Sequence, residues 1–135
     1  KDDKAVRNKA DMLANLHSKA ASVVDARGAG RFTGEEAEPR PEMASGHIPG
    51  SRNLPFGQLF NADGTWKRGD ELNQAYADAG VDLSKPMITT CGSGMTAAVV
   101  LFGARMTGKT DVSLYDGSWS EWGLDKDTPK AQGAA

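Results

Sequence analysis

The 135-residue sequence contains few of the side chains that build disulfides or metal centres. It has one cysteine, Cys91, and two histidines, His17 and His47. A single cysteine excludes an internal disulfide, and these three side chains are too few to ligate a zinc cluster. We therefore expect no metal, and a reducing, cytoplasmic compartment.

The sequence also lacks long apolar runs and an excess of positive charge. No stretch approaches the roughly 18 consecutive apolar residues of a membrane-spanning helix. With 16 Lys and Arg against 18 Asp and Glu, the formal net charge is −2, and the basic residues do not cluster. We therefore expect neither a membrane protein nor a nucleic-acid-binding protein.

The chain begins with neither an initiator methionine nor an apolar signal segment. It starts Lys1-Asp2-Asp3, which we interpret as the start of a fragment or of a processed product. The length, together with a hydrophobic content of 39%, predicts one compact domain with its own core.

Apolar residues recur with both helical and strand-like spacings. Residues 2–20 place them at steps of three and four, which predicts an amphipathic helix. Helices are also expected from residue 70 to Gly80 and over 97–106, where an almost wholly apolar sequence indicates burial. Short apolar runs typical of parallel strands occupy residues 22–26, 87–90 and 112–115. The alternation predicts an α/β fold with a central, mostly parallel sheet flanked by helices on both faces.

Other parts of the sequence show no regular periodicity. Residues 27–52 are rich in glycine and proline, and we interpret them as a long irregular excursion, which in a compact domain usually has a function. Residues 53–66 are turn-like, and residues 125–135 are interpreted as a frayed tail.

The predicted strand at 87–90 runs directly into Cys91-Gly92-Ser93-Gly94-Met95-Thr96. The two glycines can turn successive backbone N–H groups inward, and a helix that begins near Thr96 points its positive end at the same place. Such a cradle stabilises a thiolate, a persulfide or an oxyanion. The alternative is that Cys91 is a small buried hydrophobic residue, but its place between a strand and a Gly-x-Gly turn favours nucleophilic attack.

Two reaction classes use a cysteine held in this way. Cysteine phosphatases bind the transferring phosphate with an arginine six residues after the nucleophile, but this position is Ala97 and the loop carries no charge. Sulfur transfer needs less from the loop, because the cysteine takes up an outer sulfur atom as a persulfide and passes it to a second nucleophile. The sequence therefore favours sulfur transfer.

Seven short segments follow one another in the order found in one known family. They are Val24-Asp25-Ala26-Arg27, Gly30-Arg31-Phe32-Thr33-Gly34, Glu38-Pro39-Arg40, Gly46-His47-Ile48-Pro49-Gly50-Ser51, Asn53-Leu54-Pro55-Phe56, the Cys91 loop, and the run from Tyr115 to Gly123. Together they make the chain similar to the rhodanese superfamily over about residues 20–124. Within it, the chain resembles the C-terminal catalytic domain of two-domain 3-mercaptopyruvate sulfurtransferases.

The resemblance implies a rhodanese-like fold and a persulfide on Cys91. It implies 3-mercaptopyruvate as the donor, a thiol such as thioredoxin or cyanide as the acceptor, and no cofactor. Arg31 and Arg40 would hold the donor's carboxylate and keto oxygen, and Ser93 would relay a proton. Substrate contacts would also come from the loop residues Gly92, Ser93, Gly94, Met95 and Thr96.

The same resemblance implies that the chain consists of three segments. Residues 1–20 would be the end of an interdomain linker and the first helix, residues 21–124 the catalytic domain, and residues 125–135 the C-terminal tail. An N-terminal rhodanese domain of the same enzyme is implied as a partner. Met95 stands where the family often has valine, a change that alters packing beside the loop.

Several alternatives remain open at this point. The protein could prefer thiosulfate, or be a non-catalytic rhodanese-like binding or regulatory module, although the neutral loop suits a donor with one carboxylate better than a dianion. Arg31 and Arg40 could instead be solvated or paired with nearby acids, which are Glu35, Glu36 and Glu38.

Three other residues are expected to be structural. His47, within Gly46-His47-Ile48-Pro49-Gly50, is expected to brace a turn by hydrogen bonds rather than act as a base. Trp119 and Trp122 are expected to be core and wall residues.

Overall fold

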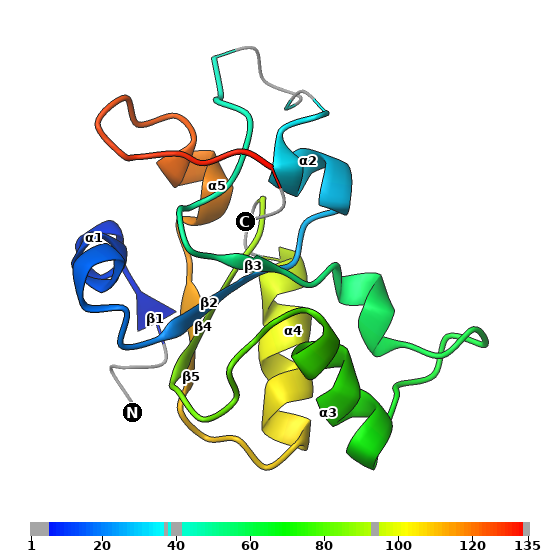
Figure 1. The fold of residues 1–135 in the computed structure, drawn as a ribbon. Coiled ribbons are helices and arrows are strands. Elements are labelled where there is room, and N and C mark those ends of the chain that lie inside the picture. The colour runs from blue at the N-terminus through cyan, green and yellow to red at the C-terminus, as the bar shows by residue number, and fades with distance from the viewer. Residues whose placement is uncertain (1–5, 37, 39–41, 93–94, 134–135) are drawn as a thin grey trace.

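The structure, a computed structural model, describes residues 6–36, 38, 42–92 and 95–133. In this part of the chain, short strands form one five-stranded sheet in the order β1-β5-β4-β2-β3, and every pair is parallel (Figure 1). The strands are β1 (Val6–Arg7), β2 (Ser22–Asp25), β3 (Arg52–Asn53), β4 (Met87–Thr90) and β5 (Val112–Tyr115). The prediction of a mostly parallel sheet is confirmed.

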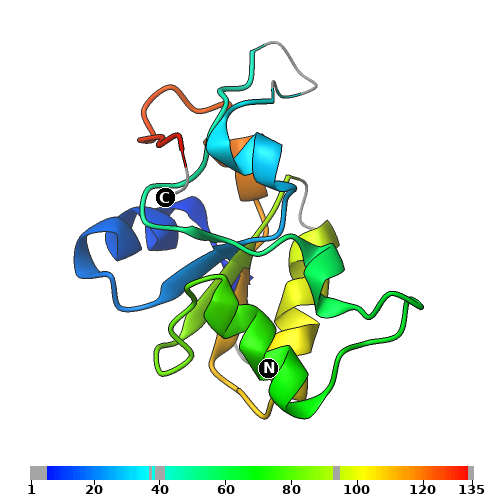
Figure 2. The same ribbon diagram turned by 45° about the vertical axis from the view of Figure 1, so that its right-hand side comes forward.

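Helices cover both faces of the sheet, as expected. They are α1 (Lys9–Ser18), α2 (Ala29–Thr33), the 3₁₀ helix η2 (Phe56–Leu59), α3 (Gly69–Asp78), α4 (Met95–Met106) and α5 (Ser118–Trp122). Figures 1 and 2 show α3 and α4 together on one side of the sheet and α1 on the other, with α2 and α5 beyond the carboxyl ends of the strands. No described helix is long and apolar enough to cross a membrane.

The alternation of side chains along the strands explains why an apolar core lies on each face of the sheet. Val24 belongs to the core on the α3 and α4 side, and its neighbour Val23 belongs to the core that also contains Met12 of α1 and Trp119 of α5. Since successive side chains of a strand point to opposite faces, a two-sided core needs consecutive apolar residues, and the strand sequences supply them.

The first predicted helix is partly wrong. Val6, which we assigned to the helix, lies in the edge strand β1 opposite Leu114 and is 56% exposed. The helix begins only after Asn8, whose side chain accepts a hydrogen bond from the Asp11 N–H, while the Asp11 carboxylate accepts one from the Asn8 N–H. This capping box fixes the start of α1 and frees the preceding residues to pair with β5.

The excursion at 27–52 is more regular than predicted. It contains α2, a five-residue helix between Gly28 and Gly34, and ends in the short strand β3 beside β2. A helix of this length is too short to show a periodic apolar face, which is why the sequence pattern missed it.

Two further expectations need correction. The described part of the 125–135 tail is packed rather than frayed: the Trp122 Nε1–H donates to the Pro129 carbonyl, and Ala131 pairs with His47 through two backbone hydrogen bonds. Helix α4 is not buried all round, because Phe102 is 55% exposed and Met106 41% exposed.

Candidate functional site

Cys91 lies at the carboxyl end of the central strand β4, where it was predicted. It is buried, and its main chain is joined to the start of α5. The Trp119 N–H donates to the Cys91 carbonyl at 2.7 Å, and the Ser120 N–H donates to the Gly92 carbonyl at 3.0 Å. These two hydrogen bonds fix the backbone on both sides of the Cys91–Gly92 peptide, so the thiol is presented by rigid elements.

Ser118 supports this arrangement and was missed by the sequence analysis. It is buried, and its backbone adopts a left-handed conformation with φ of 53°. Its hydroxyl donates to the Tyr115 carbonyl at 3.0 Å and accepts a long hydrogen bond, 3.4 Å, from the Cys91 N–H. A non-glycine residue pays for this conformation in strain, which is most often seen at functional sites. A serine directly after Asp116-Gly117 at the end of a strand was the available signal.

The loop after Cys91 is described in part. Ser93 and Gly94, predicted as site residues, lie outside the described residues. α4 begins at Met95 rather than at Ala97, and Thr96 is half-buried in its first turn. The amino end of this helix therefore follows the loop directly, and its partial positive charge favours an anion there.

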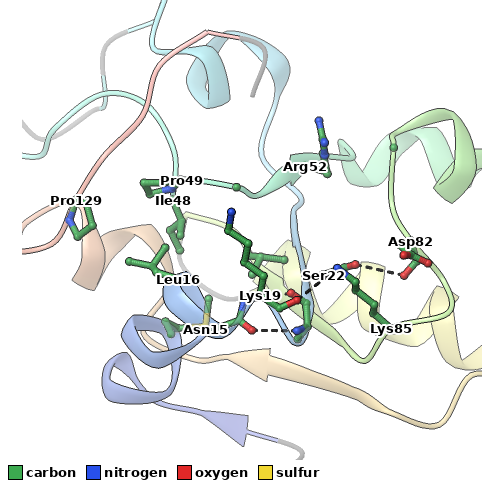
Figure 3. Close-up of a pocket in the computed structure, with 15 residues that line it drawn as sticks. Asn15, Leu16, Lys19, Ser22, Ile48, Pro49, Arg52, Asp82, Lys85 and Pro129 are labelled. Atoms are coloured by element: carbon green, nitrogen blue, oxygen red, sulfur yellow. Dashed lines mark hydrogen bonds between the residues drawn. The ribbon is translucent and has the colours of Figure 1, made fainter.

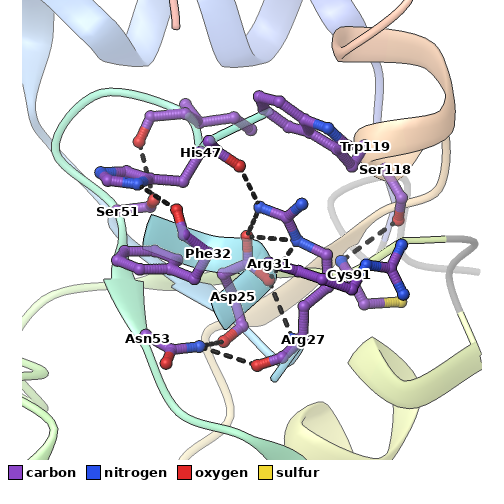
Figure 4. Close-up of polar contacts among 12 residues, drawn as sticks. Asp25, Arg27, Arg31, Phe32, His47, Ser51, Asn53, Cys91, Ser118 and Trp119 are labelled. Carbon is purple, nitrogen blue, oxygen red and sulfur yellow. Dashed lines mark hydrogen bonds and ion pairs between the residues drawn. The ribbon is translucent and has the colours of Figure 1, made fainter. Parts of the chain in front are cut away.

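A buried charge cluster lies beside Cys91 at the same edge of the sheet. Asp25, the last residue of β2, pairs in register with Thr90 of β4. Arg27 binds both carboxylate oxygens of Asp25, with Nη2 at 2.9 Å from Oδ2, and its Nη1 lies 3.1 Å from Oε2 of Glu38 (Figure 4). All three side chains are at most 2% exposed. Buried charges of this kind are tolerated only when paired, so the cluster is a tightly constrained support for the site.

Arg31 extends this cluster toward Cys91. Its Nη2 donates to Oε1 of Glu38 at 2.7 Å, so the ion pair considered as an alternative is present, with Glu38 as the partner. The hydrogen bond to Glu38 raises the pKa of the Arg31 guanidinium, which stays charged. A Cβ atom at position 92 would lie 3.1 Å from Arg31 Nη2, so the guanidinium covers the backbone of Gly92. Figure 4 shows the Arg31 side chain reaching toward Cys91.

The charges of the cluster balance. Asp25 and Glu38 carry two negative charges, and Arg27 and Arg31 carry two positive ones. Arg31 is 35% exposed on its side chain and is the one member of the four that can meet a ligand from solvent. Arg40, the other predicted donor-binding arginine, lies outside the described residues.

His47 braces the turn, as expected. Its ring stacks on that of Phe32 with centroids 3.8 Å apart, and Nδ1 lies 2.7 Å from the Phe32 carbonyl. Because a carbonyl only accepts, Nδ1 carries the proton. Nε2 is buried and has no hydrogen-bond partner among the described residues. His47 thus holds the last turn of α2, which carries Arg31.

The two tryptophans are core and wall residues, which confirms the expectation. Trp119 and Trp122 are almost fully buried. The Arg27 guanidinium lies 4.6 Å from the Trp119 ring centroid, and the Trp119 Nε1–H donates to the Ala44 carbonyl at 2.8 Å. Trp119 therefore forms one wall of the charge cluster while its backbone holds Cys91.

The described residues contain no group of three or more His, Cys, Asp or Glu side chains placed to hold a metal ion. The site that they do form consists of one buried cysteine at a strand end, a helix that starts behind it, and a half-exposed arginine beside it. This arrangement suits a nucleophilic thiol acting on a small anion.

Comparisons with known proteins agree with this chemistry. The chain is 47% identical to the 3-mercaptopyruvate sulfurtransferase of Rattus norvegicus over 90% of its own length and 41% of the relative's. It is also 47% identical to the thiosulfate sulfurtransferase of Cricetulus griseus, over 82% of this chain and 38% of the relative. The chain thus spans less than half the length of these relatives.

A solved structure and a family match also relate this chain to rhodanese-like proteins. The Tum1 protein of Saccharomyces cerevisiae superposes with a TM-score of 0.86 at 36% identity, covering 98% of this chain and 48% of that one. Residues 8–125 match the rhodanese-like domain family. The chain therefore belongs to the rhodanese-like domain family.

Proposed function

We propose that this chain is the catalytic domain of a 3-mercaptopyruvate sulfurtransferase and that Cys91 carries the sulfur. The observation that carries the proposal is the placement of Cys91 at the end of β4, fixed by the backbone of α5 and next to Arg31. The similarity to a 3-mercaptopyruvate sulfurtransferase supports it. A non-catalytic binding module would have no need for a cysteine held in this way.

The reaction would proceed in two displacements. The Cys91 thiolate attacks the sulfur of 3-mercaptopyruvate, a new S–S bond forms, and the C–S bond breaks with its electron pair leaving on carbon. The resulting enolate takes a proton and becomes pyruvate, while the enzyme holds a persulfide. A thiolate acceptor, or cyanide, then attacks the outer sulfur, and the S–S bond breaks to return the Cys91 thiolate.

The residues around Cys91 have distinct parts in this proposal. Arg31 binds the carboxylate or the keto oxygen of the donor, because its guanidinium is charged, half-exposed and beside Gly92. Arg40 makes the second contact, and Ser93 passes the proton. Backbone N–H groups of the loop and the amino end of α4 stabilise the negative sulfur, which assigns substrate contacts to Gly92, Ser93, Gly94, Met95 and Thr96.

The donor preference follows from charge. Because Asp25 and Glu38 neutralise Arg27 and Arg31, the described cluster has no excess positive charge to offer a dianion such as thiosulfate. A donor with a single carboxylate needs only one charge-assisted contact from each arginine. Thiosulfate sulfurtransferase activity is the second candidate, and the equal identity to the thiosulfate sulfurtransferase of Cricetulus griseus favours it.

We also propose that a second rhodanese-like domain completes the donor cleft, since the chain spans less than half of its relatives. Thioredoxin as the acceptor and a cytoplasmic location belong to the same proposal.

If the cleft is shared, adding the separate second domain should increase donor turnover and slow alkylation of Cys91. Titration of that domain against both rates tests the idea, and it fails if neither rate changes.

The experiment for the function itself is the intact mass of the chain after incubation with 3-mercaptopyruvate or thiosulfate. We expect a gain of one sulfur atom that dithiothreitol removes. The fraction of the chain that gains sulfur should be larger with 3-mercaptopyruvate than with thiosulfate. Cys91→Ser serves as the control and should gain nothing. Absence of any sulfur gain with either donor would overturn the assignment in favour of a binding module.

A further inference from the structure

A pocket of about 610 Å³ opens at the opposite edge of the sheet from Cys91 (Figure 3). It lies between α1, the first residues of β2, the segment 48–52 and the connection from α3 to β4. Cys91, Gly92 and Arg31 do not line it. Its volume falls within the range of small-molecule sites, and no step of the proposed sulfur transfer uses it.

One wall of this pocket is apolar. Met12 and Val23 meet Ile48 at its base, and all three side chains are at most 5% exposed. Leu16 and Pro49 continue the surface toward solvent and are half-buried. A wall of this composition favours the apolar body of a ligand over a bare inorganic ion.

The mouth of the pocket is basic. Lys19, Arg52 and Lys85 line it, and in the described part of the chain none of them forms an ion pair. The one acid there, Asp82, accepts hydrogen bonds from the backbone and the hydroxyl of Ser84. Among the described residues, the mouth thus has three positive charges against one negative charge, in a chain whose net charge is −2.

Lys19 has a backbone conformation that is usual for glycine rather than for lysine. It caps α1 with φ of 53°, the left-handed region where glycine is usual at the end of a helix. A non-glycine residue is strained there. The position nevertheless places an ammonium group at the pocket, and the Lys85 ammonium donates to the Lys19 carbonyl at 3.4 Å.

The other polar side chains of the pocket are already engaged. The Asn15 amide donates to the Ala21 carbonyl and accepts from the Ala21 N–H. The Ser22 hydroxyl donates to the Asp82 carbonyl. Polar recognition in this pocket must therefore come from the three cations at its mouth.

We propose that this pocket binds an organic monoanion, with its apolar body against Met12, Leu16 and Ile48 and its anionic group among Lys19, Arg52 and Lys85. The ligand class is an amphipathic carboxylate, sulfonate or phosphate diester. Binding here is independent of the proposed sulfur transfer, because the pocket shares no residue with the Cys91 site.

The test uses a pair of fluorescent probes that differ in charge. 8-Anilinonaphthalene-1-sulfonate carries the anion, and N-phenyl-1-naphthylamine has the same rings without it. We expect the sulfonate to bind in a one-to-one ratio and more tightly than the neutral probe. Amide chemical-shift changes on titration should centre on Asn15, Gly50 and Gly80 rather than on Gly92.

Charge-reversal variants locate the anion. Lys19→Glu, Arg52→Glu and Lys85→Glu should each weaken the sulfonate about 5- to 10-fold and leave the neutral probe within about twofold. Arg68→Glu is the matched control, because Arg68 is exposed, lies at the other end of α3 and does not line the pocket. Leu16→Ala should weaken both probes.

Three results would overturn the proposal. They are equal binding of the two probes, loss of sulfonate affinity in Arg68→Glu as large as in the pocket variants, or shifts centred on Gly92. Far-ultraviolet circular dichroism of each variant shows whether the fold is kept, and the three reversals are independent, so one variant that fails to fold leaves two that decide the question.

Discussion

The two edges of the central sheet hold positive charge in opposite ways. At the carboxyl edge, Arg27 and Arg31 share the two acids Asp25 and Glu38, and three of these four side chains are buried. At the amino edge, Lys19 and its two basic neighbours are exposed and lack ion-pair partners among the described residues. Buried, paired charges position a reacting group, whereas exposed charges remain available to a ligand.

The difference follows from what surrounds each edge. The carboxyl edge is covered by α2 and α5 (Figure 1), so charges there lose water and must find partners within the protein. The amino edge is open between α1 and the α3–β4 connection, where water solvates the cations until a ligand replaces it. The edge with the paired charges also holds the cysteine, so the comparison predicts that sulfur transfer depends on that edge.

The largest effect should come from the cysteine itself. Cys91→Ser is expected to reduce sulfur transfer to background, because serine does not form the anionic nucleophile at neutral pH. Pyruvate release from 3-mercaptopyruvate measures it, and the urea midpoint should stay close to that of the unaltered chain. Retained turnover in this variant would contradict the proposed mechanism.

The next largest effect concerns the buried pairing. Arg27→Met leaves Asp25 and Glu38 buried beside a neutral side chain, so the free energy of unfolding should fall by about 3–5 kcal/mol. Arg31→Met is the matched control, because Arg31 is half-exposed and Glu38 keeps Arg27 as a partner. Urea unfolding followed by tryptophan fluorescence compares them. Equal losses of unfolding free energy in the two variants would contradict the role of Arg27 as the buried partner of the cluster's acids.

Removal of the donor-binding charge should affect binding more than stability. Arg31→Ala and Arg40→Ala should each raise KM for 3-mercaptopyruvate about 10- to 100-fold, since each removes a proposed charge-assisted hydrogen bond to the donor, of about 1.5–3 kcal/mol. The increase for thiosulfate should be smaller. Steady-state kinetics with both donors provide the comparison, and equal losses would indicate that the arginines are structural.

The smallest effect tests charge balance. Glu38→Gln leaves one positive charge in excess at the carboxyl edge, so the ratio of kcat/KM for thiosulfate to that for 3-mercaptopyruvate should rise several-fold. Glu35→Gln is the control, because Glu35 is exposed and is not among the groups that shift the pKa of Arg31. If a folded Glu38→Gln variant shows an unchanged ratio, the net charge of the cluster does not determine the donor preference.

The sequence predicted the parts of the molecule that depend on local pattern. The strands at 87–90 and 112–115 have the predicted bounds, and the position of Cys91 follows from the first of them. The start of α1 was misplaced because the capping box around Asn8 was overlooked in favour of apolar spacing. Helix α2 was missed because five residues between two glycines show no period.

The support for the site could not be predicted in the same way. Arg31 and Glu38 are seven residues apart in a segment without periodicity, so only the fold decides which of three nearby acids becomes the partner. The pairing of Arg27 with Glu38 likewise depends on the chain turning back after α2, whereas Asp25 is only two residues from Arg27. Charged residues placed directly after a buried strand were the one local signal.

The most direct test of the central claim follows one sulfur atom through Cys91. The chain is incubated with 3-mercaptopyruvate carrying isotopically labelled sulfur, digested before and after addition of cyanide, and the peptides are weighed. We predict label on the Cys91 peptide before cyanide and in thiocyanate afterwards, with the peptide returned to its original mass. Labelled thiocyanate without prior label on Cys91, or label that stays on Cys91 after cyanide, would contradict sulfur transfer through this residue.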